Sequence, residues 1–313
     1  MNAVVSEPVR LARPAGLRRP LFVLPILAVV VALAACDRPA TRDSEAAQVL
    51  RIGGIPDQDV ARLERMFGLM AGHLQRSTGM PVEYVPANDY AALVGAFQRG
   101  DVQLAWFGGL TGVQALAVTP DAHAIAQRPR DAEFHSVFIV GPGVTASGLA
   151  DLKGKSFTFG SESSTSGHLM PRHFLAQAGV QADADFAGAP GYSGSHDATY
   201  KLVESGAFQA GALNEAVWQS AVAEGRVDTT KVRVLLVTEP YFDYHWAVRG
   251  DVDERLGAGA SERIRQALLS LAAEQGAVET ELLELFATDR FVPTADSNYV
   301  AIRAVAEGLG ILR

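Results

Sequence analysis

The sequence predicts an α/β fold of two lobes with mainly parallel sheets. Short runs rich in β-forming residues alternate with amphipathic helical patterns from residue 49 onward, which is typical of this class. The alternation starts a second time after residue 151. In a chain of 313 residues, the part after position 48 is long enough for one large or two medium domains. We therefore expect two lobes of similar construction.

The first series of elements begins with a strand at 49–53 and a long helix at 58–77. In that helix, apolar side chains such as Val60, Leu63 and Phe67 recur at steps of three or four residues. The pattern then predicts a strand at 82–85, a helix at 90–98, a strand at 103–106, a helix at 110–117, and strands near 122–126 and 136–140. These elements build the first lobe as far as the last strand, where the chain crosses over.

A second series follows the charged turn at 151–155. It comprises a strand at 156–159, helices near 166–177 and 196–204, a strand at 209–213, a helix at 216–224 and a strand at 232–237. Helices near 261–274, 279–287 and 299–309 are expected to pack back on the first lobe. The chain would then cross between lobes near 135–139 and 238–244, and two crossings make a hinge beside a cleft. The predicted lobes are residues 49–137 plus 241–313, and residues 138–240.

The first 36 residues have the three-part layout of a secretory signal peptide. Four arginines between positions 10 and 19 precede an apolar stretch at 21–35, which is short for a hydrocarbon core of roughly 30 Å. The stretch ends in Leu33-Ala34-Ala35-Cys36, which resembles the bacterial lipobox. We expect a signal peptide at 1–36, a lipid on Cys36 and a flexible tether at 37–48. The mature protein would be exported and anchored to the cell membrane, facing the periplasm or the extracellular side.

The amino-acid composition excludes several functions. Cys36 is the single cysteine, so disulfides and cysteine-based metal sites are not expected. The seven histidines are scattered, and the sequence indicates neither a metal site nor a cofactor. Removal of residues 1–36 leaves 23 basic against 34 acidic residues and changes the formal net charge from −8 to −11. Such a surface would repel nucleic acid.

The strongest indication of a binding site is the segment Gly160-Ser161-Glu162-Ser163-Ser164-Thr165-Ser166-Gly167-His168. It follows a predicted strand and opens a helix, where free backbone N–H groups and the positive end of the helix dipole point outward together. Five of the six residues at 161–166 are Ser or Thr, whose hydroxyls add donors. This pattern favours an anion site. The alternative is an ordinary helix N-cap, for which one hydroxyl would suffice.

Other regions are expected to meet this segment in one crevice. Gly191-Tyr192-Ser193-Gly194-Ser195-His196-Asp197 is a second flexible turn that runs into a helix, and its hydroxyls and imidazole are further donors. Trp106 and Phe107 lie at the end of a predicted strand, and Tyr90 opens a helix. Ligands of open α/β sheets bind beyond the carboxyl ends of strands. For Trp106 and Phe107, packing in the core is the alternative.

Taken in order, five motifs resemble the phosphate, phosphite and phosphonate binding proteins of ABC importers. They are Ile55-Pro56-Asp57, Asp89-Tyr90-Ala91-Ala92, DVQLAWFGG at 101–109, GSESSTSG at 160–167 and YSGSHD at 192–197. The resemblance runs from about residue 49 to 309. It implies a type II periplasmic binding protein fold, whose two α/β lobes close on a tetrahedral oxyanion. It also implies that Ser164, Thr165 and Ser166 hold the anion, and that Tyr90 and His196 line the cleft.

The chain departs from family members that bind aminoalkylphosphonates. In those proteins carboxylates receive the amine, and the corresponding positions here fall near Asn214 and Tyr244, which are not acidic. The aromatic run at 241–246 suggests a small, closed pocket, with a buried strand at the hinge as the alternative. The full set of expected ligand contacts is Tyr90, Trp106, Phe107, Ser164, Thr165, Ser166, Tyr192, Ser195, His196, Asn214 and Tyr244.

The protonation state of the ligand provides a discriminator. A phosphate or phosphonate monoanion presents an O–H that needs an acceptor, whereas sulfate or selenate offers only acceptors. A pocket of hydroxyls, N–H groups and histidine without a carboxylate would favour the fully ionised anion. The GSESSTSG and DYHW stretches are similar to a subgroup labelled selenate transporters. The sequence leaves open whether a carboxylate enters the cleft, and the candidates are Glu162, Asp197, Glu215 and Asp243.

The expected function is that of a substrate-binding lipoprotein, not an enzyme. It would capture a small oxyanion by hinge closure and deliver it, as a monomer, to an ABC permease and its ATPase. One alternative is a sensor subunit that presents the ligand to a signalling receptor. A serine hydrolase built on Ser195, His196 and Asp197 is the other, although adjacent residues do not normally form a triad and the Gly-x-Ser-x-Gly elbow is missing.

Overall fold

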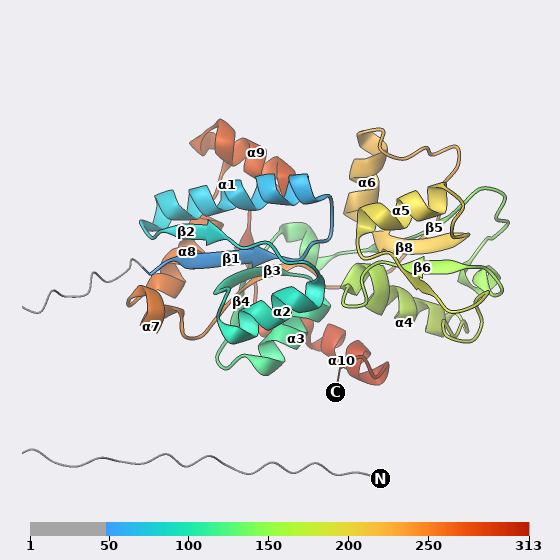
Figure 1. The fold of residues 1–313 in the computed structure, drawn as a ribbon, viewed down its shortest axis with the longest axis horizontal. Helices are drawn as coiled ribbons and strands as arrows, with labels where there is room; N and C mark the ends of the chain where they lie inside the picture. The colour runs from blue at the N-terminus through green and yellow to red at the C-terminus, as the bar shows by residue number, and fades with distance from the viewer. Residues whose placement is uncertain (1–47, 313) are drawn as a thin grey trace, which may run out of the picture. The chain divides into compact units, whose positions relative to one another are not determined.

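The computed structural model describes residues 48–312 and has an α/β fold built on two sheets (Figure 1). The predicted signal peptide, Cys36 and residues 37–47 of the predicted tether lie outside the described residues. Within residues 48–312, no helix is long and apolar enough to cross a membrane.

The first sheet has six strands and carries the N-terminal and C-terminal elements. Its order is β11 (Val292–Pro293), β4 (His123–Gln127), β10 (His245–Val248), β3 (Leu104–Phe107), β1 (Leu50–Gly54) and β2 (Val82–Tyr84). Strand β1 pairs in parallel with β2 and β3, whereas β10 runs antiparallel to both β3 and β4. We call this sheet and its helices the first lobe.

Helices cover both faces of the first sheet. Figure 1 shows α1 (Val60–Thr78) above the sheet and α2 (Tyr90–Arg99) and α3 (Gly109–Val118) below it. Helices α8 (Ala260–Leu269) and α9 (Ala277–Leu285) pack against α1, α10 (Val300–Gly308) packs against α3, and the short α7 (Val252–Leu256) adjoins α8. The C-terminal helices therefore pack on helices of the first lobe.

The second sheet has five strands, in the order β7 (Gly191–Tyr192), β6 (Phe157–Phe159), β8 (Ala210–Asn214), β5 (Ser136–Val140) and β9 (Arg233–Val237). The central strand β5 is buried on both faces. Val137 and Ile139 face a core that includes α5 (His196–Glu204) and α6 (Glu215–Ala223), while Phe138 and Val140 face a core that includes α4 (Met170–Gln177). This sheet and its helices form the second lobe.

Both sheets are mixed, so neighbouring strands are parallel, as predicted, only for β1 with β2 and β3 and for β6 with β7 and β8. In each sheet, one central strand runs against its neighbours: β10 in the first and β5 in the second. Both strands adjoin the segments by which the chain passes from one sheet to the other. A βα series alone gives parallel neighbours, whereas a strand that enters from the other lobe is free to run in the opposite direction.

The two crossing segments lie side by side. The backbone N–H of Phe134 donates to the carbonyl of Tyr241 at 2.8 Å, and the N–H of Tyr241 donates back to Phe134 at 2.9 Å. Strand β5 begins at Ser136, so the predicted boundary between 137 and 138 falls inside it. The paired crossings form a narrow connection between the lobes, and the groups discussed below lie next to it.

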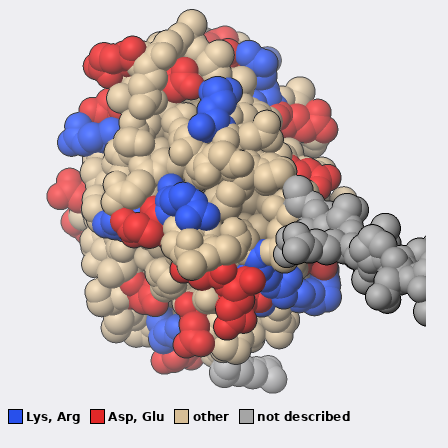
Figure 2. All heavy atoms as spheres, turned by 90° about the vertical axis from the view of Figure 1, so that its left-hand side faces the viewer, with Lys and Arg blue, Asp and Glu red and all other residues tan. Residues whose placement is uncertain are grey.

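Charged side chains of both signs are interspersed on the surface that faces the viewer in Figure 2. Aspartate and glutamate side chains lie among lysines and arginines on this face, with uncharged surface between them. The view looks at the first-lobe end of the molecule, on the left of Figure 1.

Candidate functional site

The hydroxyl-rich segment lies between β6 and α4, and its central residues are buried. Ser164, Thr165 and Ser166 retain 2%, 2% and 1% of their accessible surface. The Oγ of Ser164 accepts a hydrogen bond from Gly167 N at 2.9 Å and so caps the single π-helical turn Thr165–Leu169 that precedes α4. The N-cap explanation therefore accounts for Ser164 alone. Thr165 and Ser166 are buried for another reason.

Thr165 and Asp243 come from different lobes and meet at Gly108. Thr165 Oγ1 accepts from Leu110 N at 2.9 Å, and Asp243 Oδ1 accepts from Gly109 N at 2.8 Å. A Cβ atom on Gly108 would lie 3.1 Å from Thr165 Oγ1 and 3.2 Å from Asp243 Oδ1. The first turn of α3 therefore holds a threonine hydroxyl and a carboxylate next to each other, and a side chain at position 108 would crowd both.

Three buried polar atoms near this point lack a hydrogen-bond partner among residues 48–312. They are Tyr90 Oη, Ser166 Oγ and Asp243 Oδ2. Burial raises the pKa of Tyr90 well above its usual range, and the nearby carboxylates of Asp57 and Asp243 raise it further. Buried polar groups are nearly always paired, because an unpaired one loses its hydration without compensation. These three atoms, with the Thr165 hydroxyl proton, are suited to surround a small polar ligand.

The sequence left open which carboxylate, if any, enters the cleft. Of the four candidates, Asp243 is the one that lies beside the hydroxyl-rich segment. Its side chain is buried, and burial raises its pKa from 3.8 to about 7, against the lowering effect of the Gly109 N–H. With a pKa of about 7 the carboxyl is partly ionised at neutral pH, and its Oδ2, which has no partner among residues 48–312, can then accept a hydrogen bond from a ligand. Glu162 is exposed, Glu215 accepts from Gln219 on α6, and Asp197 is held by Arg226.

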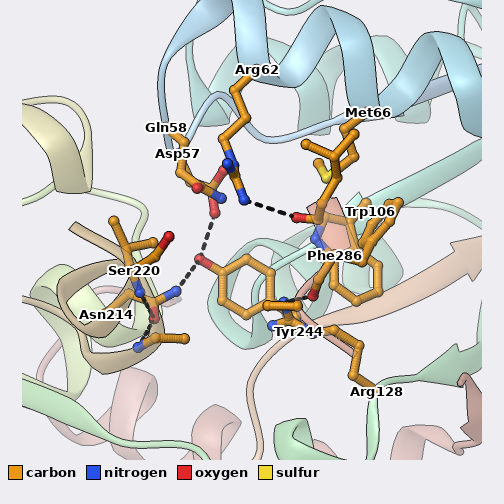
Figure 3. Close-up of a pocket in the computed structure, with 14 residues that line it drawn as sticks. Asp57, Gln58, Arg62, Met66, Trp106, Arg128, Asn214, Ser220, Tyr244 and Phe286 are labelled. Carbon is orange, nitrogen blue, oxygen red and sulfur yellow. Dashed lines mark hydrogen bonds between the residues drawn. The ribbon is translucent and has the colours of Figure 1, made fainter. Parts of the chain in front are cut away.

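Tyr244 is the centre of a hydrogen-bond network that joins the two lobes (Figure 3). Its hydroxyl donates to Asp57 Oδ2 at 2.8 Å and accepts from Asn214 Nδ2 at 3.2 Å. The Nδ1 of His196 accepts from the backbone N–H of Asn214 at 3.3 Å, so the proton is on Nε2, which lies 3.3 Å from the Tyr244 hydroxyl. Both ring nitrogens of His196 are therefore engaged by protein groups.

Burial also sets the charges in this network. It lowers the pKa of His196 to about 4, so the imidazole is neutral at pH 7, and it raises the pKa of Asp57 to about 6. Asp57 lies just beyond the carboxyl end of β1, in a motif quoted above, but it was not among the expected ligand contacts. The signal that could have found it is its position at the end of a buried strand.

The ring of Tyr244 packs against an aromatic ring and an arginine. Trp106 stacks on Tyr244 with ring centroids 5.6 Å apart, and the Arg128 guanidinium lies 5.0 Å from the Tyr244 centroid and 5.1 Å from that of Trp106. Figure 3 shows these groups around a cavity of about 30 Å³, which also adjoins Asp57 and Asn214. This volume accommodates about one water molecule. There is therefore little space beside the Tyr244 hydroxyl.

Three expected contacts lie elsewhere. Phe107 packs edge-on against Phe97 in the first-lobe core, because alternate residues of β3 face opposite sides of the sheet. Tyr192 is 39% exposed and its hydroxyl accepts from Arg172. Ser195 caps its own helix by accepting from Ala198 N. Their roles are packing, a surface contact and helix capping. The other eight expected residues lie in two adjoining groups. Tyr90, Ser164, Thr165 and Ser166 lie near Asp243, and Trp106, His196, Asn214 and Tyr244 lie around Asp57 and Arg128.

The hydrogen bonds of residues 195–197 do not form a catalytic triad. Ser195 Oγ bonds within α5, His196 bonds to Asn214 and Tyr244, and Asp197 bonds to Tyr200 and Arg226. A triad needs the base to contact both the nucleophile and the orienting acid. Ser195, His196 and Asp197 therefore do not act together as a serine-hydrolase site.

Two α/β lobes, joined by paired crossings and enclosing buried hydrogen-bonding groups from both sides, define a type II periplasmic binding protein. The chain belongs to the family described as "ABC transporter, phosphonate, periplasmic substrate-binding protein", which matches residues 52–299. It is 39% identical over 272 residues to the probable ABC transporter phosphite binding protein PhnD1 of Prochlorococcus marinus, covering 85% of this chain and 91% of that protein. It is 25% identical over 294 residues to the phosphate-import protein PhnD of Mycolicibacterium smegmatis, covering 88% and 90%.

A solved structure agrees with this assignment. The structure of Prochlorococcus marinus PhnD1 in complex with methylphosphonate matches with a TM-score of 0.81 and 40% identity, covering 85% of this chain and all of that one. The chain is thus a substrate-binding protein of an ABC importer and not an enzyme. As such it is exported, binds a small anion, and works with a permease and its ATPase.

Proposed function

We propose that the ligand is a singly protonated oxyanion of phosphorus, such as the monoanion of phosphite or of a small phosphonate. The observation that carries this proposal is the buried carboxylate of Asp243, whose Oδ2 has no hydrogen-bond partner among residues 48–312, close to the Thr165 and Ser166 hydroxyls. A ligand P–O–H has a donor that an ionised carboxylate can accept, and fully ionised sulfate or selenate has none. The methylphosphonate in the solved structure of the Prochlorococcus relative supports the same class.

The proposed ligand contacts come from both lobes. Tyr90 and Asp243 contribute from the first lobe, and Ser164, Thr165 and Ser166 from the second. Tyr244, with His196, Asn214 and Trp106 around it, is proposed to form the wall that limits the size of the substituent on phosphorus. Neither Asn214 nor Tyr244 carries a negative charge that could receive an amine, which supports a hydrogen or methyl substituent in preference to an aminoalkyl chain.

We also propose how the two lobes divide the chain and how the protein is held at the membrane. The first lobe is residues 49–135 plus 241–313 and the second lobe is residues 136–240, since β5 begins at Ser136, and closure about the paired crossings encloses the ligand. The protein is proposed to be a monomer held at the membrane by a lipid on Cys36, because a short tether raises its concentration near the permease.

Thermal unfolding with a panel of oxyanions tests the ligand class. Phosphite and methylphosphonate are expected to raise the melting temperature, because a ligand that binds only the folded protein stabilises it by about 2.7 kcal/mol at 100 times its Kd. Aminoethylphosphonate, phosphate, sulfate and selenate complete the panel. A response to selenate or sulfate alone would contradict the protonated-ligand proposal, and no response to any oxyanion would contradict the ligand class.

The pH dependence of affinity tests the proton on the ligand. With the Asp243 pKa at about 7, a protonated monoanion binds best when Asp243 is ionised and the ligand still carries its proton. Its affinity is expected to fall on both sides of an optimum, by about tenfold per pH unit on the acid side. Selenate would instead bind protonated Asp243, so its affinity would stay level below pH 7 and fall above it. Titration calorimetry from pH 5 to 9 distinguishes the two profiles.

A further inference from the structure

The N-termini of α1 in the first lobe and α5 in the second lobe cap each other across the cleft. The backbone N–H of His196, the first residue of α5, donates to the carbonyl of Asp57 at 3.0 Å. In the reverse direction, the N–H of Asp59, the N-cap of α1, donates to Asp197 Oδ2 at 3.0 Å. We call these two hydrogen bonds the cross-cap.

The cross-cap satisfies donors that have no acceptor within their own helices. The first N–H groups of a helix have no intrahelical partner, and the N-terminus carries partial positive charge. Asp59 already uses its side chain to accept from Ala61 N and Arg62 N of α1. Two such N-termini would repel each other, so the Asp197 carboxylate placed between them stabilises their approach. Each helix thus completes its N-terminal hydrogen bonds only when the lobes are together.

Asp197 is held in position by contacts inside the second lobe. Its Oδ1 accepts from Tyr200 Oη at 2.7 Å and from Arg226 Nη1 at 2.6 Å, and only 9% of its side chain is exposed. Oδ2 is left to face Asp59. At the rim of the same contact, Arg62 of α1 lies 3.8 Å from Glu224, which also accepts from Arg226. The carboxylate is therefore oriented before the first lobe arrives.

We propose that the cross-cap is a latch that holds the two lobes closed, and that Asp197 is a positioning residue that sets how long the ligand stays bound without touching it. The ligand part of this inference rests on the proposed function. Asp197 itself lies outside the group of anion-holding residues, because its carboxylate bonds to Asp59, Tyr200 and Arg226. It acts on the closed state alone, so it changes dissociation more than association.

The decisive variant is the isosteric Asp197→Asn, with Tyr200→Phe as its matched control. An asparagine has one acceptor oxygen, and this oxygen accepts the hydrogen bonds from Arg226 and Tyr200. The amide N–H₂ of the asparagine then faces the Asp59 N–H, so two donors oppose each other. Tyr200→Phe removes a hydrogen bond from the same carboxylate but leaves Oδ2 facing Asp59. Both changes act on α5, and thermal unfolding shows whether each variant remains folded.

The first measurement is amide hydrogen exchange at His196, by NMR, with and without saturating phosphite. This amide bonds to Asp57, so neither substitution removes its acceptor. In Asp197→Asn its exchange is expected to accelerate about tenfold or more, because a hydrogen bond to a charged group contributes about 1.5–3 kcal/mol. In Tyr200→Phe it is expected to stay near the native rate. Native exchange in Asp197→Asn, or equal acceleration in both variants, would overturn the latch.

The second measurement is phosphite dissociation by stopped-flow competition. Asp197→Asn is expected to accelerate it about 10- to 100-fold with little change in the association rate. Native dissociation in this variant would overturn the role of Asp197 in ligand retention. If the native chain binds no oxyanion, the proposed function fails, and His196 exchange in the ligand-free protein still decides the latch.

Discussion

Replacing Asp243 by Asn is expected to weaken phosphite binding at pH 7 by about 100-fold or more, the largest effect of any single change in the pocket. The amide keeps one oxygen for the Gly109 N–H and turns its N–H₂ toward the position of Oδ2. A donor then faces the ligand P–O–H, so a charge-assisted hydrogen bond is lost and two donors oppose each other. Isothermal titration of both proteins with phosphite measures the loss.

A matched control is Glu215→Gln, which changes a carboxylate at the start of α6 that bonds to Gln219 and not to the pocket. Its affinity should equal that of the native protein. Native affinity in Asp243→Asn would mean that the ligand brings no proton to this position, and it would favour a fully ionised anion.

The Asp243→Asn substitution is also expected to stabilise the ligand-free protein at alkaline pH. The folded pKa of Asp243 is about 7 and its ordinary value is 3.8, so between these values the folded state binds more protons than the unfolded state. Ionisation of this buried carboxyl therefore destabilises the fold progressively as pH rises from about 4 to 7. Asparagine does not titrate, so the stability gain should be largest at pH 8 and shrink toward pH 4. Urea unfolding at pH 4.5, 6 and 8 measures it.

This opposition between stability and binding explains why the pocket contains groups that are unfavourable in an empty fold. Asp57 and Asp243 are both buried carboxylates with raised pKa values, and Ser166 and Tyr90 bury hydroxyls that have no protein partner in residues 48–312. Each lowers the stability of the ligand-free protein. A loss of folding stability of this kind is expected at positions where the side chain is needed to bind a ligand and not to pack the core.

The sequence predicted elements with a strong local pattern and missed those defined by their neighbours. Strand β5 and helix α5 have the predicted bounds, because an apolar run and a Ser N-cap mark them locally. Strands β7 and β11 have two residues each and carry no periodic signal. The four residues of β10 are all buried between β3 and β4, so the alternation that identifies a half-buried strand is missing.

The site could be predicted only where one segment contains the signal. The hydroxyls at 164–166 stand together in the sequence, and they also lie together in the fold. Asp57 and Tyr244 share a hydrogen bond across 187 positions, and Asp243 meets Thr165 only because the lobes pack at the first turn of α3. Conversely, Tyr192 and Ser195 belong to a Gly/Ser turn typical of ligand loops, but the turn uses its groups to cap α5 and to contact Arg172.

Replacing Ser166 by Ala is expected to weaken phosphite binding by about tenfold or more and to raise the stability of the ligand-free protein slightly, because Ser166 Oγ is buried without a partner in the described part of the chain. Thr165→Ala should cost affinity and stability together. Its Oγ1 accepts from Leu110 N across the lobes, and the change leaves that buried N–H unpaired, at a cost of about 1–3 kcal/mol. The double variant should lose about 100-fold or more, with some non-additivity because the two residues are neighbours.

Ser163→Ala is the matched control, since Ser163 adjoins the same turn but is only half-buried and outside the hydroxyl cluster. Calorimetry gives the affinities and chemical unfolding gives the stabilities of all four proteins. If Ser166→Ala and Thr165→Ala both kept native affinity, the segment at 160–168 would be a helix cap and the anion would bind elsewhere. A stability loss in Ser166→Ala equal to that in Thr165→Ala would instead place its hydroxyl in the packing of the turn. The contrast between these adjacent residues therefore separates anion binding from lobe packing within one turn of the chain.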